Sequence, residues 1–217
     1  EVVLPDTVEQ IEKGAFAQCD KLTSAIIPES VVSFGTDIFQ DCKSLRYVEL
    51  PQNMTRIPAN MFYCCDSLEN LVIPNGVETI EEGAFYGAGL KRLNLPASVK
   101  TLERWSFAWL TNLRDIVIPD TVTTIGTYAF NETNNVSTVT IGSGVTSIGY
   151  QAFSFYDINR DDYDTVMNVK TVQVATALQR SGYGRDIYLN DVLYEGYYGT
   201  QFSVGPVTNM ITSESTV

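Results

Sequence analysis

The 217-residue chain contains no histidine, and this absence excludes most familiar catalytic groupings. Neither a Ser-His-Asp nor a Cys-His arrangement can form without an imidazole base. The sequence also lacks a phosphate-binding loop and a dinucleotide-binding fingerprint. On the sheet predicted below, Glu49 and Asp115 would lie three strands, or roughly 14 Å, apart. That separation is too large for a glycoside-cleaving carboxylate pair. We therefore expect no enzyme activity, no catalytic residue and no cofactor.

Positive charge and long apolar runs are also scarce. The chain has 14 Lys and Arg against 26 Asp and Glu, which gives a net charge of −12 and a pI of about 4.3. Such an acidic chain repels phosphate backbones and anionic membrane surfaces, so we expect no nucleic-acid partner. No apolar run reaches the roughly 18 residues needed to span a bilayer, and no signal peptide opens the sequence. Four cysteines are too few for a disulfide scaffold of this size.

What the sequence does contain is a repeat. Prolines recur at steps of 23, 23, 23, 22 and 23 residues, and a glycine takes the next place: Pro5, Pro28, Pro51, Pro74, Pro96, Pro119 and Gly142. A phenylalanine follows each of them 11 residues later: Phe16, Phe39, Phe62, Phe85, Phe107, Phe130 and Phe153. Apolar residues keep the same frame three and six positions after the proline. A fixed period of this length indicates stacked coils that bury one continuous core.

The run before each proline alternates between apolar and polar residues, as expected for a half-buried strand. We predict about eight parallel strands, ending at Leu4, Ile27, Leu50, Ile73, Leu95, Ile118, Ile141 and Val174. The strand of residues 1–5 would belong to a coil whose first half lies outside this sequence. Residues 168–174 match residues 135–141 but follow them by 33 positions, so about ten residues within 154–167 should bulge from the stack.

The repeat stops after residue 174. The sequence therefore predicts a solenoid over residues 1–174 and a capping segment with a tail over residues 175–217. Within the latter, Ile187–Tyr194 is expected to form a hairpin with an Asn190-Asp191 turn. The aromatic residues between 183 and 202 could cover the last coil, or could form a platform for a carbohydrate or peptide. Residues 212–217 should be a frayed tail or linker.

The Pro-x-x-Val-x-x-Ile frame, with segments such as Ile80-Glu-Glu-Gly-Ala-Phe85, resembles the BspA-like leucine-rich repeats. The resemblance covers residues 1–174. It implies a leucine-rich-repeat β-solenoid, an α/β-type right-handed superhelix with a non-repeat C-terminal cap. It also implies a bacterial or protist protein, extracellular or at the cell surface, that adheres to or binds partners. The family has no shared catalytic residues, so none is carried over.

Two other groups of residues have a specific chemical interpretation. Cys19, Cys42 and Cys65 each follow a repeat phenylalanine by three positions and should form an inward ladder bonded to backbone. A disulfide between neighbouring coils is geometrically possible. A metal site is not expected at this spacing, and Cys64, out of register, is the candidate reactive thiol. Residues 157–164 begin like a calcium-binding loop but then depart from it, so a solvated acidic loop is the alternative.

The exposed face of the predicted sheet is the candidate partner-binding site. Residues two and four positions before each proline point outward and form two adjacent rows. On the middle strands the rows contain Tyr47, Asn70, Arg92 and Asp115, and Glu49, Val72, Asn94 and Val117. Tyrosine and arginine are common at binding hot spots. The alternative is an ordinary solvated sheet with a weak Arg92–Asp115 surface pair. Trp109, on the opposite side, is either a second anchor or packed against a neighbouring coil.

We therefore expect a monomeric cell-surface module that presents a rigid face to a protein or glycan. The alternative is a structural spacer within a larger surface protein, with no ligand of its own. No part of this sequence is expected to insert into a membrane.

Overall fold

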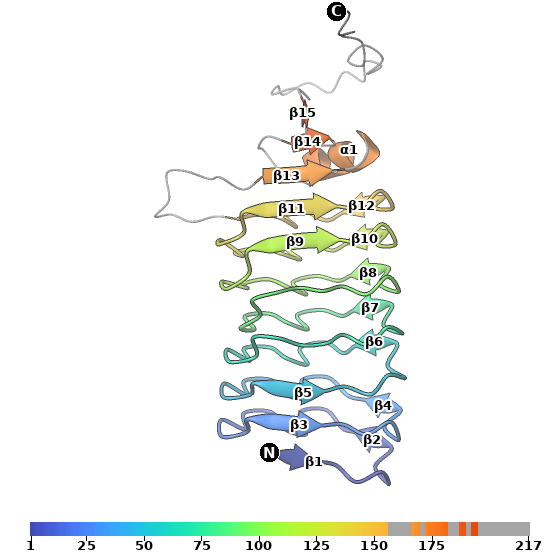
Figure 1. The fold of residues 1–217 in the computed structure, drawn as a ribbon, viewed down its shortest axis with the longest axis vertical. Coiled ribbons are helices and arrows are strands. Elements are labelled where there is room, and N and C mark those ends of the chain that lie inside the picture. Colours follow the sequence, from blue (N-terminus) through green and yellow to red (C-terminus); the bar gives the residue numbers. More distant parts are fainter. Residues whose placement is uncertain (156–165, 170–171, 182–186, 190–191, 195–217) are drawn as a thin grey trace, which may run out of the picture.

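The computed structural model describes residues 1–155, 166–169, 172–181, 187–189 and 192–194. The chain winds into an elongated stack of coils whose neighbours are related by the 23-residue period (Figure 1). Each complete coil contributes one segment to a first side of the stack, a shorter strand to a second side, and a series of tight turns. The predicted leucine-rich-repeat β-solenoid is therefore confirmed.

A column of stacked phenylalanine rings runs through the interior from Phe16 to Phe153. Neighbouring ring centroids are 5.2–5.8 Å apart, and neighbouring planes differ by only 5–16°. The five inner rings are fully buried, and the valines and leucines of the repeat frame pack around them. Burial of one such ring stabilises the fold by about 1.5–3 kcal/mol, and aromatic pairing adds to this.

The first side carries parallel strands joined coil to coil. β1 (Val2–Val3), β3 (Ser24–Ile26) and β5 (Tyr47–Glu49) form one sheet. β9 (Asp115–Ile118), β11 (Thr138–Ile141) and β13 (Val166–Val169) belong to a second sheet further along the stack. Between the two sheets, residues 69–73 and 91–95 follow the path of the coils but are not strands. Five of the eight predicted strands therefore lie where expected. The predicted strands that end at Ile73 and Leu95 are wrong, because those segments are not strands.

The row of strands on the second side is also interrupted, and Pro58 causes the gap. β2 (Gln10–Ile11) pairs with β4 (Ser33–Phe34), and a separate five-stranded sheet follows them, made of β6 (Arg56–Ile57), β7 (Thr79–Ile80), β8 (Thr101–Leu102), β10 (Thr124–Ile125) and β12 (Ser147–Ile148).

The gap lies between β4 and β6. In the coils that carry β7 and β8, the residue after the strand donates its N–H to the preceding coil, as Glu81 does to Ile57 at 3.0 Å. Pro58 has no N–H to donate. The Arg56 guanidinium replaces this bond, donating to the Phe34 carbonyl at 2.9 Å and to the Glu81 carboxylate at 2.7 Å. One side chain therefore joins three coils.

The end of the repeat differs from the prediction. β13 pairs with β11 in a register that sets Val166 beside Thr138, an offset of 28 residues. The predicted strand ending at Val174 is therefore wrong, because residues Val172–Arg180 form helix α1. Sequence matching favoured the later segment because Val172-Gln173-Val174 alternates like a half-buried strand, whereas Val174, Ala175 and Leu178 have the spacing of one helix face.

Helix α1 covers the last coil. Val174, Ala175 and Leu178 are fully buried in the same core as the repeat phenylalanines, and the Gln151 N–H donates to the Ser181 carbonyl at 2.7 Å. Beyond the helix, β14 (Ile187–Leu189) pairs in parallel with β13 and antiparallel with β15 (Val192–Tyr194). The predicted antiparallel pairing of the hairpin is confirmed, and its predicted Asn190-Asp191 turn lies outside the described residues. The predicted tail at residues 212–217 lies outside the described residues.

Replacing one ring of the column should destabilise the whole stack. Phe85→Ala removes a fully buried ring that stacks on both neighbours, so the free energy of unfolding should fall by about 3–5 kcal/mol. Urea denaturation followed by circular dichroism measures this. Val32→Ala, at a side chain 71% exposed, is the control and should change stability by less than about 0.5 kcal/mol. Equal effects of the two substitutions would contradict the assigned core.

The Arg56 bridge gives a second prediction. Arg56→Ala should lower the free energy of unfolding by about 1–3 kcal/mol, because the Phe34 carbonyl and the Glu81 carboxylate both lose a donor. Lys100→Ala is the matched control, since Lys100 forms an exposed ion pair with Glu78 at 2.8 Å and should contribute under about 1 kcal/mol. An Arg56 variant no less stable than the Lys100 variant would refute the bridge.

Candidate functional site

The eight predicted site residues all lie on the first side of the stack with exposed side chains: Tyr47, Glu49, Asn70, Val72, Arg92, Asn94, Asp115 and Val117. The strand registers place residues that precede successive prolines side by side, as for Ile26 beside Glu49 and Val117 beside Thr140. The row then continues to Asn168 on β13. The predicted continuation to Gln173 is wrong, because Gln173 lies in helix α1.

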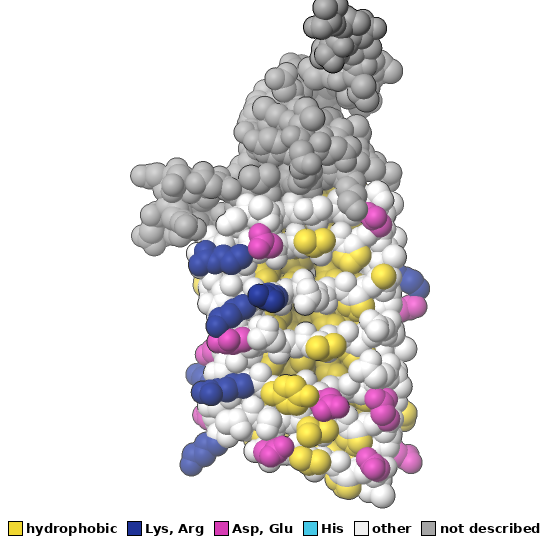
Figure 2. All heavy atoms as spheres, in the orientation of Figure 1, with side chains coloured by type: hydrophobic (Ala, Val, Ile, Leu, Met, Phe, Trp, Pro, Cys, Tyr) yellow, Lys and Arg dark blue, Asp and Glu magenta, His cyan; other side chains and the backbone are white. Residues whose placement is uncertain are grey.

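Several large hydrophobic side chains are exposed to solvent on this face. Val72 is 79% exposed and Val117 is 57% exposed, and Tyr47 is 52% exposed. Figure 2 views this side of the stack and shows hydrophobic side chains along its middle, with Lys and Arg gathered at the left margin. An apolar strip with charged margins has the composition of an interaction surface.

Hydrogen bonds fix some of these side chains and leave others free. The Tyr47 hydroxyl donates to Glu49 at 3.2 Å, and this bond to the carboxylate raises the pKa of Tyr47. The Thr138 hydroxyl donates to Asp115. The predicted Arg92–Asp115 ion pair is not formed, and Arg92 has no ion pair among the described residues. Arg92 is thus an exposed cation available to a partner.

The middle of the face is held differently from its ends. Along residues 69–73 and 91–95, one backbone hydrogen bond joins the coils, from the Lys91 N–H to the Glu69 carbonyl at 3.0 Å. Most of the backbone hydrogen bonds between coils are therefore missing beneath Asn70, Val72, Arg92 and Asn94. The interior ring column and the second-side sheet continue past this stretch, so the coils stay in register there.

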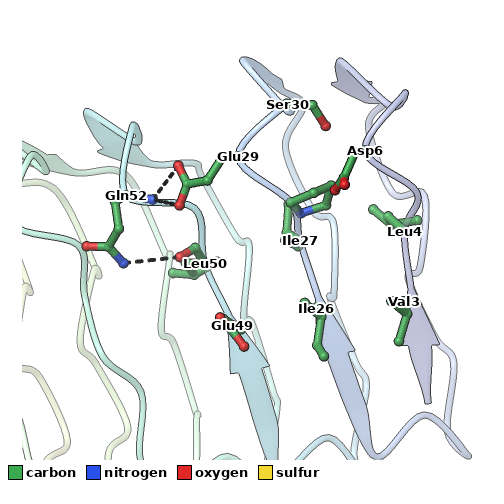
Figure 3. A pocket seen from close by; sticks show the side chains of 11 residues that line it. Val3, Leu4, Asp6, Ile26, Ile27, Glu29, Ser30, Glu49, Leu50 and Gln52 are labelled. Carbon is green, nitrogen blue, oxygen red and sulfur yellow. Dashed lines mark hydrogen bonds between the residues drawn. The ribbon is translucent and has the colours of Figure 1, made fainter.

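A groove of about 620 Å³ lies at the carboxyl ends of β1, β3 and β5. Figure 3 shows that its main polar contacts are internal: both Glu29 oxygens accept from the Gln52 N–H, at 2.8 and 3.0 Å, and the Gln52 amide donates to Leu50 at 3.4 Å. Ile26 and Glu49, which belong to the exposed rows, also line it. The groove extends the apolar face and offers no convergent set of catalytic groups.

The cysteine ladder is confirmed for two of its three members. The Cys42 thiol donates to the Phe16 carbonyl at 2.9 Å, and the Cys65 thiol donates to the Phe39 carbonyl at 3.1 Å. Thr133 makes the equivalent bond to Phe107 further along the stack. All four cysteines are free, and Cys19 is exposed on the first coil. Burial raises the pKa of Cys42 to about 11 and also raises the pKa of the half-exposed Cys64.

Other predicted sites lie beyond what the structure describes. The acidic segment 157–164 and most of the aromatic segment 183–202 fall outside the described residues. Within the described part of the chain, no group of three or more His, Cys, Asp or Glu side chains could hold a metal ion, and no helix could cross a membrane.

Comparison with known proteins supplies the family. The model described as "BspA type Leucine rich repeat region" matches residues 1–114 and 100–173, with six copies. The chain belongs to the BspA-type leucine-rich-repeat family. This family comprises surface and interaction modules, and no ligand follows from membership. No curated protein matches the chain.

The first two of the following solved structures share the fold. A leucine-rich repeat protein from Bacteroides ovatus is 22% identical with a TM-score of 0.59, over 79% of this chain and 54% of its own. The chain thus spans about half the length of that protein. The leucine-rich repeat protein of T. pallidum is 20% identical with a TM-score of 0.51, over 83% and 82%. A leucine-rich cell surface protein from Faecalibacterium prausnitzii is 29% identical with a TM-score of 0.46, over 71% and 35%.

Thiol labelling tests the ladder. With iodoacetamide at pH 8, native protein should be modified at Cys19 and remain unmodified at Cys42 and Cys65, because burial favours their thiol forms. Because burial raises the pKa of Cys42 to about 11, ionisation of this thiol opposes folding, so stability that is intact below about pH 9 should fall as the pH rises toward 11. Mass spectrometry of tryptic peptides identifies the modified sites. Rapid labelling of Cys65 in the folded protein would show that this thiol is accessible, and would contradict the buried cysteine ladder.

Proposed function

We propose that this chain is a binding or adhesion module that presents the first side of its solenoid to a protein or glycan at the cell surface. The observation that carries the proposal is the exposure of all eight predicted site residues on one continuous side of a rigid stack. Tyr47 and Arg92 would be the anchors, and Val72 and Val117 would supply apolar contact area.

The scaffold favours binding because little order has to be created when a partner arrives. The coils are fixed by the ring column and the interlocking turns, so the loss of conformational entropy on binding should be small. Each coil adds two outward side chains, and a partner that lies along the stack can contact several coils at once. An extended partner therefore suits this surface better than a small molecule.

The surface location rests on the family assignment, and we propose it for this chain on that basis. The family also accommodates a second role, a spacer that holds another domain away from the cell. The grouping of the exposed Tyr47, Val72 and Val117 on one side favours binding over the spacer role, because a spacer has no need to gather apolar side chains on one face.

A screen against extracellular-matrix proteins and a glycan array tests the proposal. A true ligand should bind the Tyr47→Ala/Arg92→Ala double variant about tenfold or more weakly, because both side chains would be lost from the centre of the interface. Neither substitution should unfold the protein, since both side chains are exposed. Thermal denaturation of the double variant checks this.

Val32→Ala is the matched control, because Val32 is equally apolar, 71% exposed, and not a member of the two candidate rows. Its affinity for the ligand should equal that of the unmodified chain. A ligand whose affinity responds to Val32 and not to the double variant would move the site elsewhere. Complete absence of a ligand for the folded protein would favour the spacer.

A further inference from the structure

The turns of each coil contain two positions with left-handed backbone, nine and thirteen residues after the repeat proline. The first position is occupied by Gly14, Asp37, Asn60, Gly83, Trp105, Tyr128 and Gln151. The second is occupied by Gln18, Asp41, Cys64, Gly87, Trp109 and Glu132. Glycine, asparagine and aspartate adopt this conformation at low cost, whereas bulky side chains rarely do.

Both tryptophans of the chain occupy these positions, with φ of 55° at Trp105 and 60° at Trp109. A non-glycine residue in this region costs about 1–2 kcal/mol. Burial does not recover that cost at Trp109, whose side chain is 48% exposed. Gly87 fills the same position one coil earlier, so the fold itself does not require a tryptophan. A strained, exposed aromatic residue of this kind suggests a function.

Trp109 completes a row of three aromatic rings on consecutive coils. The Tyr63 and Tyr86 rings stack with centroids 4.7 Å apart, and the Tyr86 and Trp109 rings lie 6.5 Å apart. Backbone bonds from Cys64 to Tyr86 at 2.7 Å and from Trp109 to Asn131 at 2.8 Å hold these turns together. The row is therefore preformed on the turn side, at positions in the coil distinct from the first-side rows.

A carboxylate flanks each end of this row. At one end the Asp41 N–H donates to the Tyr63 carbonyl at 2.8 Å. At the other, Glu132 follows Asn131, to which Trp109 is bonded. Neither carboxylate has an ion pair among the described residues. Burial raises the pKa of Tyr63, with smaller contributions from Cys64 and then Asp41. Burial also raises the pKa of Tyr86, with smaller contributions from Tyr63, Cys64 and then Glu132.

We infer that Tyr63, Tyr86 and Trp109, together with Asp41 and Glu132, form a second interaction surface that binds a basic peptide segment through arginine or lysine side chains. An aromatic ring face attracts cations, and Trp109, the exposed ring at the end of the stacked row, is the ring that can offer one. The Asp41 and Glu132 carboxylates accept hydrogen bonds from Gln40 and Asn134 but have no ion pair among the described residues, so they add complementary charge. The chain's net charge of −12 favours the same ligand. This surface is independent of the proposed first-side site.

The coil that carries Trp109 already contains a contact between a cation and a tryptophan ring. The Arg104 guanidinium lies 3.6 Å from the centroid of the Trp105 ring, and Trp105 also stacks on Tyr128 at 6.1 Å. Trp105 is therefore occupied by the chain's own cation, whereas Trp109 has no such cation among the described residues. The two tryptophans form a natural pair of test and control.

The test is a fluorescence titration with a peptide of alternating arginine and glycine residues. Trp105→Phe leaves Trp109 as the single tryptophan of the chain, so its emission should change as the arginine peptide binds and should not change with a glutamate–glycine peptide. Affinity should fall as salt is added. Calorimetry on the unmodified protein gives the reference dissociation constant.

Variants then separate the contributions. Trp109→Gly, compatible with the left-handed backbone, should weaken binding about fivefold or more, and Trp109→Phe should restore part of the affinity. Glu132→Gln should also weaken binding while it can still accept the Asn134 bond seen at 3.0 Å. The Tyr47→Ala/Arg92→Ala variant should bind the peptide normally, which separates this surface from the first-side site.

The inference is overturned if the Trp109→Gly protein, shown to be folded, binds the arginine peptide as tightly as the unmodified chain. It is also overturned if Trp105→Ala weakens binding as much as Trp109→Gly. Binding of neutral oligosaccharides through Trp109 without binding of the arginine peptide would assign the row to a glycan and contradict the cationic partner.

Discussion

Coil-on-coil stacking of the phenylalanine column is the interaction on which the rest of the structure depends. A 23-residue coil is too short to bury its own apolar residues, and the two faces of each inner ring are covered by the rings of the coils before and after it. The parallel planes and fully buried rings show that this contact is repeated with little variation along the stack. Backbone ladders on either side can then be interrupted without loss of register.

Two interruptions show how the column supports function. On the second side, Pro58 removes a ladder bond, and Arg56 bridges the gap. On the first side, the ladder opens beneath the centre of the proposed binding face. Because the interior is continuous there, the exposed rows keep their order without a continuous backbone ladder. The residues at the turn positions can also vary while the coils stay in register, and two of these positions hold tryptophans with left-handed backbone.

The repeat could be predicted from the sequence because its signals are periodic. The proline and phenylalanine series and the ladder bonds of Cys42 and Cys65 follow from fixed spacing, whereas the Ile187–Tyr194 hairpin was predicted from its turn residues. The final coil could not be placed, since the match of residues 168–174 to a strand concealed an amphipathic helix whose partners lie in the last coil. The missing ladder bonds and the role of Arg56 depend on contacts between coils, which composition does not reveal.

The candidate face could be located from residues two and four before each proline, because side chains alternate along a strand. Trp109 was named from the sequence as a possible second anchor, but its row with Tyr63 and Tyr86 was not predicted, although a signal was present. Trp105 occupies a turn position that holds glycine, asparagine or aspartate in earlier coils, and Trp109 occupies one that holds smaller residues there: Gln18, Asp41, Cys64 and Gly87. A comparison of the turn positions coil by coil would have found it. Its pairing with Asp41 and Glu132 required the three-dimensional arrangement.

Amide hydrogen exchange on the free protein tests most directly whether stacking alone holds the centre of the face. The N–H groups of Phe62, Phe85 and Phe107 bond to the next coil at 2.8–2.9 Å and should exchange slowly, at rates set by global unfolding. Amides of residues 71–73 and 92–94, which lack ladder bonds, should exchange much faster. Fast exchange at all three phenylalanines would mean that the stack opens in the middle, and would contradict a rigid binding face.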